Sequence, residues 1–193
     1  FQTNVKRMLA YSSVAQIGYM ILGISLVSVT GLTASISHLF NHALMKGTLF
    51  MALGCVSFRV GAAKLERMAG IGRTMPWTMG AFMIGGLSLI GVPLTAGFVS
   101  KWYLVVGALE KGWWPVAVLV LITSLLAVIY IWRVVEAAYF KPAPEGQIVR
   151  EAPLALLVPA WTLALANLYF GLDTSLNAGV AQQAAEMLLG VGQ

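Results

Sequence analysis

Long apolar runs separated by short polar segments dominate the chain and predict its architecture. Five runs approach or exceed the roughly 20 residues that an α-helix needs to cross a bilayer. These runs cover residues 8–30, 33–58, 76–108, 113–140 and 152–172. The fold class expected from this pattern is all-α, a polytopic membrane protein with about five transmembrane helices.

Polar, glycine-rich and proline-rich segments predict the connections between these helices. Small polar residues around Gly31 predict the first turn, GAAKLERMAGIGRTMP (61–76) a charged loop, and KPAPEGQIVREAP (141–153) a proline-rich loop. Residues 1–172 are therefore expected to belong to one transmembrane domain. Residues 173–193 form a mildly amphipathic C-terminal tail, which we expect to lie along the membrane surface.

The third apolar run is interrupted near its middle. Gly91, Pro93 and Gly97 occur within LSLIGVPLTAGFVSKWY (87–103), where proline removes a backbone donor and glycine weakens a helix. Discontinuous membrane helices occur where exposed backbone lines a polar cavity, and transporters place ion sites at such points. We therefore expect a helix broken at Gly91–Pro93 within 76–108. A simple proline kink is the alternative.

The overall composition supports a membrane location and argues against other classes. Of the 193 residues, 59% are hydrophobic and 10% are charged, whereas about a quarter are charged in soluble domains. The net charge of +5 does not indicate nucleic-acid binding, because the basic residues lie in short segments between apolar runs. The single cysteine, Cys55, excludes an intrachain disulfide, and we expect it to be a small buried residue.

The distribution of lysine and arginine predicts the orientation in the membrane. With five spans, the side that holds residue 1 carries nine of them, and the opposite side carries only Lys111. The nine are Lys6, Arg7, Arg59, Lys64, Arg67, Arg73, Arg133, Lys141 and Arg150. The positive-inside rule therefore predicts a cytoplasmic N-terminus and an outer C-terminus. The remaining two basic residues, Lys46 and Lys101, fall inside predicted spans.

A row of ionisable residues occurs in the second span. His38, His42 and Lys46 recur at four-residue intervals, so they lie on one helix face. Small polar groups nearby are Ser35, Asn41 and Thr48. A lysine near mid-membrane is costly unless it meets water or a partner, and removal from water favours its neutral form. Histidine titrates near neutral pH. The row is therefore a candidate proton relay, and Lys101, beyond the helix break, is a further candidate member.

Simpler explanations exist for each member of the row. The histidines can be hydrogen-bonded helix contacts, and Lys46 can reach towards the interface. No cofactor is expected, because two histidines at i, i+4 cannot take opposite axial positions of one haem, and zinc would require a third ligand. The sequence contains no quinone, flavin or iron–sulfur motif.

Three stretches resemble the proton-conducting antiporter-like subunits of respiratory complex I, membrane-bound hydrogenases and Mrp-type multisubunit Na⁺/H⁺ antiporters. They are VKRMLAYSSVAQIGYM (5–20), HLFNHALMKGTLFM (38–51) and GVPLTAGFVSKWY (91–103). The resemblance covers residues 5–172 and implies two inverted five-helix repeats, of which this chain corresponds to the C-terminal part. The first repeat is then expected upstream of Phe1. SSVAQIGYMILG and the Trp-rich fourth span most resemble the D-type member of the Mrp antiporters.

The resemblance also implies roles for individual residues. Lys46 matches the central-axis lysine of the second repeat, His38 and His42 match its neighbours, and Lys101 matches a lysine on the exit route. The implied function is proton translocation in a Na⁺/H⁺ antiporter of a bacterial inner membrane, with other membrane subunits as partners and with no enzymatic site on this chain. The alternatives are a proton-pumping membrane-arm subunit of complex I or a related hydrogenase, and a structural scaffold that conducts nothing.

Overall fold

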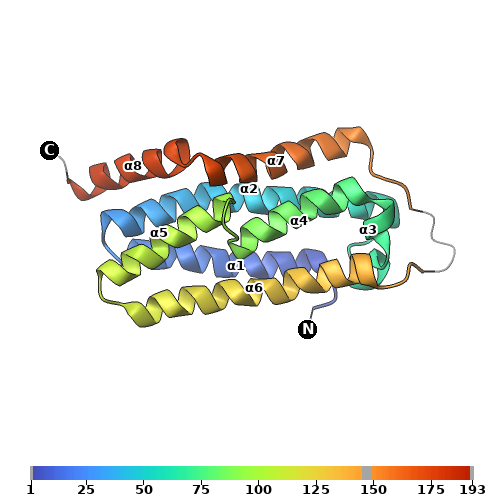
Figure 1. The fold of residues 1–193 in the computed structure, drawn as a ribbon, viewed down its shortest axis with the longest axis horizontal. Coiled ribbons are helices and arrows are strands. Elements are labelled where there is room, and N and C mark those ends of the chain that lie inside the picture. Colours follow the sequence, from blue (N-terminus) through green and yellow to red (C-terminus); the bar gives the residue numbers. More distant parts are fainter. Residues whose placement is uncertain (1, 145–148, 192–193) are drawn as a thin grey trace.

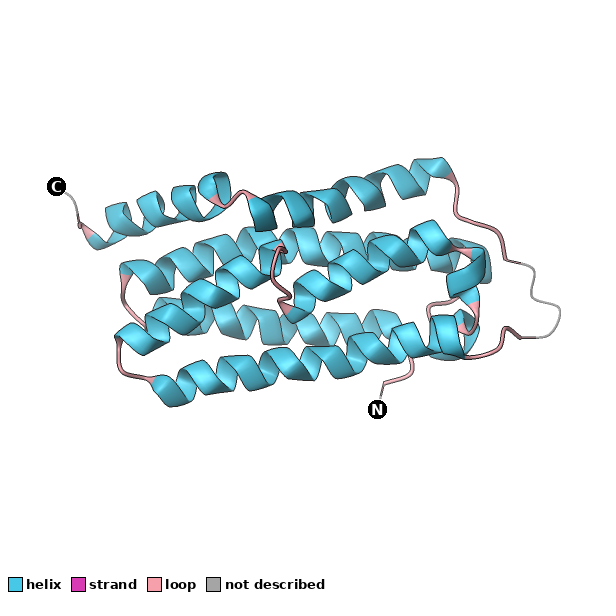
Figure 2. Cartoon of the chain, in the orientation of Figure 1, coloured by secondary structure: helices cyan, strands magenta, loops and turns pink. Residues whose placement is uncertain are grey.

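The computed structural model describes residues 2–144 and 149–191, which form helices aligned along one long axis (Figure 1, Figure 2). In chain order they are α1 (Val5–Ser25), α2 (Val29–Val60), η1 (Leu65–Met68), α3 (Ile71–Thr74), α4 (Pro76–Ile90), α5 (Ala96–Glu110), α6 (Trp114–Phe140), α7 (Leu154–Leu172), η2 (Ser175–Gly179) and α8 (Val180–Leu189). Among the described residues, α1, α2, α6 and α7 are long and apolar enough to cross a membrane, and α4 is a shorter apolar helix. The expected all-α polytopic class is confirmed.

The central element of the bundle is α2, which packs against α1, α4, α5, α7 and α8. The expected turn at Gly31 is wrong, because the chain turns at Leu26–Ser28 and Gly31 lies inside α2. Ser28 caps the helix: its Oγ accepts a hydrogen bond of 3.1 Å from the Gly31 N–H. A Cβ on Gly31 would lie 2.6 Å from the Gly23 carbonyl oxygen, so Gly31 allows α1 and α2 to approach closely.

The expected break in the third span is confirmed. The first helix break, residues 91–95, separates α4 from α5. Gly91 ends α4 with a φ of 91°, a conformation that glycine adopts readily. Pro93 lies in the break, whereas Gly97 lies in the first turn of α5. The Gly97 N–H donates a hydrogen bond of 3.1 Å to Ser88 Oγ, which ties the two half-helices together.

Gly97→Ala is expected to destabilise the protein by about 1–3 kcal/mol, a typical penalty for overpacking. A methyl group at this position would overlap the Ser88 carbonyl oxygen, which belongs to the backbone and cannot rotate away. Gly54→Ala is the matched control, because no atom lies within 4 Å of a Cβ built there. The measurement is the apparent melting temperature of each purified variant complex. Equal melting temperatures for the two variants would contradict the close approach.

The last membrane segment is longer than the sequence suggests. Figure 1 shows that η2 and α8 continue beyond α7 towards the end of the bundle opposite α3. In contrast to the expected surface tail, α8 packs against α2 and buries Ala181 and Ala185. Small side chains at these two positions let the helix lie close to its neighbour. The second helix break, residues 173–179, therefore interrupts a segment that runs beside α2.

The end of the bundle that carries α3 is held by a carboxylate from the 141–153 loop. Glu151 accepts hydrogen bonds from the Trp77 N–H (2.8 Å) and from Thr78 Oγ1 (2.6 Å). The Arg59 guanidinium donates to the Glu151 carbonyl oxygen. Glu151 thus satisfies donors in the first turn of α4, where a negative charge is favourable.

Candidate functional site

Lys46 lies near the middle of α2 and is buried, with 6% of its surface exposed. Its Nζ donates hydrogen bonds to the Leu9 carbonyl oxygen (2.7 Å) and to Ser12 Oγ, both on α1. Both acceptors are uncharged oxygens. The site can therefore hold a lysinium through oriented dipoles, and no acid has to be ionised when the lysine becomes neutral.

His38 joins three helices in the buried interior. Its Nδ1 lies 2.8 Å from Ser100 Oγ on α5, and its Nε2 lies 3.0 Å from Gln16 Oε1 on α1. An amide oxygen can only accept, so Nε2 carries the hydrogen, and Nδ1 of the neutral ring accepts from the Ser100 hydroxyl. The ring therefore has a defined tautomer in its neutral form.

His42 lies between His38 and Lys46 in the row. Its ring stacks on the His38 ring, with centroids 6.4 Å apart and an interplanar angle of 18°. His42 Nε2 is buried and has no hydrogen-bond partner among the residues that the structure describes. This nitrogen is therefore available to accept or donate a proton within the row.

Lys101 lies on α5 at the level of the first helix break and is also 6% exposed. Its Nζ donates to the carbonyl oxygens of Leu89 (2.8 Å) and Ile90 (3.0 Å). These carbonyls end α4, where helix geometry leaves them without internal partners and where the helix dipole is negative. The Lys101 Nζ also lies 5.4 Å from the centre of the Tyr19 ring, within the range of a cation–π interaction.

The structure brings all four predicted residues to the interface of α1, α2 and α5. Tyr19 connects the two ends of the group: its ring centre lies 5.7 Å from that of His38 and contacts Lys101 on its other side. Ser100, the hydrogen-bond partner of His38, precedes Lys101 directly in sequence. Gly91 and Pro93 contribute to the site through the backbone, because the break leaves the α4 carbonyls free to hold Lys101.

Sequence reasoning missed the polar residues of α1 that hold the row. Ser12, Gln16 and Tyr19 are all buried and face Lys46, His38 and Lys101 respectively. Their spacing of i, i+4, i+7 places them on one face of a helix. That recurrence of polar groups inside an apolar run is the signal that could have revealed them.

Asn41 and Thr48 form a second polar face of α2 rather than extending the row. At about 100° per residue, both lie about 140–160° around the helix from Lys46. Thr48 Oγ1 accepts a hydrogen bond of 3.0 Å from Asn167 on α7. Asn41 Oδ1 accepts from Asn177 in η2. Helix α2 is therefore polar on one side towards α1 and α5, and on another towards the last membrane segment.

Buried lysines held by neutral oxygens, beside a helix interrupted at their level, define the chain as a polytopic membrane protein with a buried polar axis. The chain belongs to the family described as NADH:quinone oxidoreductase/Mrp antiporter, TM, which matches residues 1–127. The family resemblance read from the sequence is thus confirmed.

Relatives come from both branches of this family. The chain is 42% identical over 184 residues to the N subunit of NADH-quinone oxidoreductase of Desulforudis audaxviator, covering 89% of this chain and 37% of that protein. It is 30% identical over 192 residues to the D-type member of the Na(+)/H(+) antiporter of Bacillus subtilis, covering 97% of this chain and 38% of that protein. The chain therefore spans less than half the length of these relatives.

A solved structure shares the fold closely. A chain of the Mrp complex from Dietzia sp. superposes with a TM-score of 0.88 at 27% sequence identity, over 94% of this chain and 42% of that one. A chain of respiratory complex I from Thermus thermophilus gives the same TM-score at 22% identity, which shows the fold alone.

Proposed function

We propose that this chain translocates protons as a membrane subunit of a multisubunit complex, through a relay of Lys46, His42, His38 and Lys101. The observation that carries the proposal is the continuous buried row of titratable groups, each held by uncharged oxygens or by a neighbouring ring. Such groups change protonation state without breaking an ion pair. A purely structural lysine would be expected to pair with an acid or to reach the interface.

Proton movement between members of the row needs more than direct hydrogen bonds. Residues four apart on a helix are about 6 Å apart along its axis, which is longer than one hydrogen bond. A bridging water or a rotation of the flexible lysine side chain covers that distance. At His38, a proton taken up at Nδ1 from the Ser100 side and released from Nε2 towards Gln16 crosses the ring.

Lys101 is the member best suited to hold the charge at the far end of the relay. The two terminal carbonyls of α4 and the face of Tyr19 all favour the charged lysine. Positive charges on neighbouring members repel each other, so the arrival of a proton at one favours its release from the next. This repulsion gives the relay a means of coupling to events elsewhere in the complex.

Two driving forces are compatible with the same relay. Exchange of Na⁺ or another monovalent cation for protons is supported by the similarity to the antiporter protein of Bacillus subtilis over 97% of this chain. Electron transfer in partner subunits is supported by the higher identity, 42%, to the N subunit of NADH-quinone oxidoreductase. Either function requires partner membrane subunits and no cofactor on this chain.

The deciding experiment measures proton movement in everted membrane vesicles that contain the complete native complex. A pulse of Na⁺ without any electron donor that releases protons from acidified vesicles supports cation exchange. Proton uptake that requires an electron donor and is insensitive to Na⁺ supports the redox-driven complex. Absence of proton movement under both conditions would refute the proposed function.

We further propose that the chain lies in a bacterial inner membrane as the C-terminal part of an antiporter-like transmembrane domain, with residue 1 on the cytoplasmic side. The proposal rests on the nine lysine and arginine residues assigned to the side that holds residue 1. The opposite end of the bundle is called the outer end below.

A further inference from the structure

The two helix breaks meet beside α2. The first break, residues 91–95, contacts the end of α7, because a Cβ on Gly171 would overlap the backbone of Leu94 and Thr95. The second break, residues 173–179, begins two residues later. The glycine at position 171 thus lets the two interrupted segments touch through their backbones.

Asn41 connects the two breaks with a single side chain. Its Nδ2 donates a hydrogen bond of 2.7 Å to the carbonyl oxygen of Ala96, the first residue of α5. Its Oδ1 accepts a hydrogen bond from Asn177 Nδ2 in the second break. Asn41 is fully buried and lies five residues, about 7.5 Å, from Lys46 along α2.

The segment that Asn41 holds is attached to the bundle by few side chains. Of η2 and α8, the buried residues are Asn177, Ala178, Ala181 and Ala185, and three of these are alanines. Large apolar residues of α8 point away from the protein, including Met187 and Leu188. The π-helical geometry of η2 is uncommon and is often found at functional sites. Movement of this segment therefore disrupts little packing.

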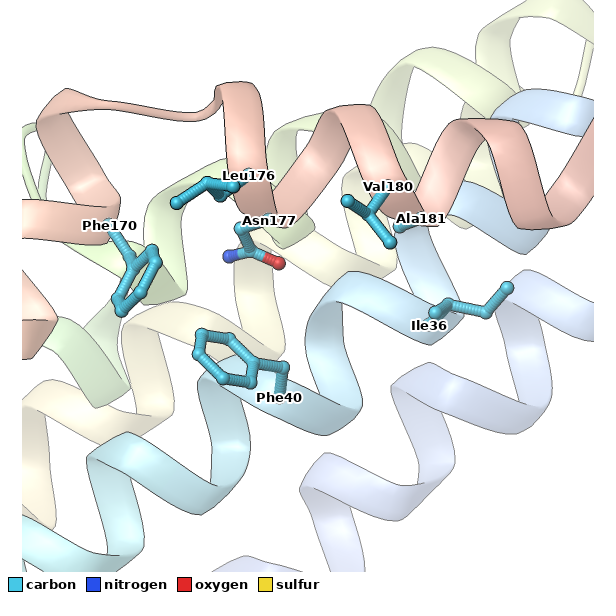
Figure 3. A pocket seen from close by; sticks show the side chains of 7 residues that line it. All are labelled: Ile36, Phe40, Phe170, Leu176, Asn177, Val180 and Ala181. Carbon is cyan, nitrogen blue, oxygen red and sulfur yellow. The ribbon is translucent and has the colours of Figure 1, made fainter.

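Cavities lie on both sides of this segment. A cavity of about 300 Å³ lies between α2 and α8, and Figure 3 shows Asn177 projecting from the last segment among the side chains that line it, with Phe40 and Phe170 beside it. A second cavity of about 510 Å³ is lined by Pro93 and Leu94 of the first break and by Glu110 at the outer end of α5. Gly171 and Thr174, next to the second break, also line this second cavity.

We propose that Asn177 and α8 form an outer gate of the relay, which is closed when Asn177 is hydrogen-bonded to Asn41. Withdrawal of Asn177 frees Asn41 and exposes the polar backbone of the first break to the outer end. Ala96 lies only five residues before Lys101 on α5, so a shift of the break also moves the lysine. The gating role rests on the proposed proton translocation, whereas the closed contact does not.

The first test measures access to the first break and is independent of transport. Thr95→Cys, in a Cys55→Ala background, places a thiol at a position that is 3% exposed. Labelling by a membrane-impermeant maleimide from the outer side is expected to become about fivefold faster when Asn177→Ala is added, the effect of losing one net hydrogen bond. Unchanged labelling would overturn the gate.

The second test locks the contact reversibly. Asn41→Cys with Asn177→Cys is treated with a short bis-methanethiosulfonate in the complete complex, because hydrogen-bonded asparagines hold their Cβ atoms further apart than a direct disulfide allows. A protease site between Phe140 and Leu154 shows the cross-link, since the two fragments then stay joined until reduced. Cross-linking is expected to stop proton movement, and reduction is expected to restore it.

The matched control is Phe40→Cys with Phe170→Cys, which links α2 to α7 before the second break. The two rings lie 4.9 Å apart and are both visible in Figure 3. This link is expected to leave proton movement unchanged. Failure of the asparagine pair to cross-link, or full activity while it is cross-linked, would refute the gate. A wild-type complex that moves no protons would refute the proposed function, and the labelling test would still decide whether the contact closes the break.

Discussion

Lys46→Met is expected to reduce proton translocation to below about 1% of the wild-type rate, a loss of at least two tenfold factors in the rate-limiting step. Methionine matches the length of the lysine stem but cannot carry a proton. Assembly is expected to survive, because the Leu9 carbonyl oxygen also accepts a hydrogen bond of 2.9 Å from Ser12 Oγ. The measurement is the initial rate of proton movement in everted vesicles, normalised to the amount of assembled complex.

Lys64→Ala is the control for Lys46→Met. Lys64 is exposed at the α3 end of the bundle, so its removal changes the net charge by the same amount without altering the buried row. This variant is expected to retain the wild-type rate. Normal translocation by a fully assembled Lys46→Met complex would exclude Lys46 from the relay and leave the row with a structural role.

Lys101→Met is expected to lose both translocation and stability. Its Nζ is the hydrogen-bond partner of the Leu89 and Ile90 carbonyl oxygens, which the apolar replacement would leave unsatisfied in the interior. The expected cost is about 1–3 kcal/mol for each buried group left without a partner. The melting temperature of the purified complex should therefore fall for Lys101→Met and remain near the wild-type value for Lys46→Met.

Lys101→Arg separates the two roles of this residue. Arginine keeps the positive charge and the hydrogen-bond donors, but it does not release its proton at physiological pH. We expect Lys101→Arg to recover most of the stability lost in Lys101→Met while translocation stays below about 1%. Wild-type translocation by Lys101→Arg would show that Lys101 acts by its charge alone and passes no proton.

The membrane class and the broken helix are predictable because both follow from local chemistry. Runs of about 20 apolar residues have few stable alternatives to a membrane helix. Gly91 and Pro93 disfavour the helix at their own positions, whatever surrounds them. Turn positions are less predictable, as Gly31 shows: this glycine serves the approach of two helices, and Ser28 determines where α2 begins.

The candidate site is only partly predictable from the sequence. Spacing alone places His38, His42 and Lys46 on one face, because helical periodicity is a property of the chain itself. The partners Gln16 and Ser100 come from other helices, and their contacts with His38 depend on how α1 and α5 pack against α2. Helix packing is set by side-chain complementarity over whole surfaces, which the pattern of one segment does not specify.

By itself, then, the sequence determined a helical membrane bundle, an interrupted third span and a row of titratable residues, since each of these depends on residues close together in the chain. Only the tertiary structure decided that Lys101 is held by the last carbonyls of α4, that Asn41 faces away from the row, and that α8 packs beside α2. The physical reason is the same in each case. A buried polar atom takes whichever partner the fold brings within hydrogen-bond distance, and for Asn41 that partner lies 136 residues further along the chain.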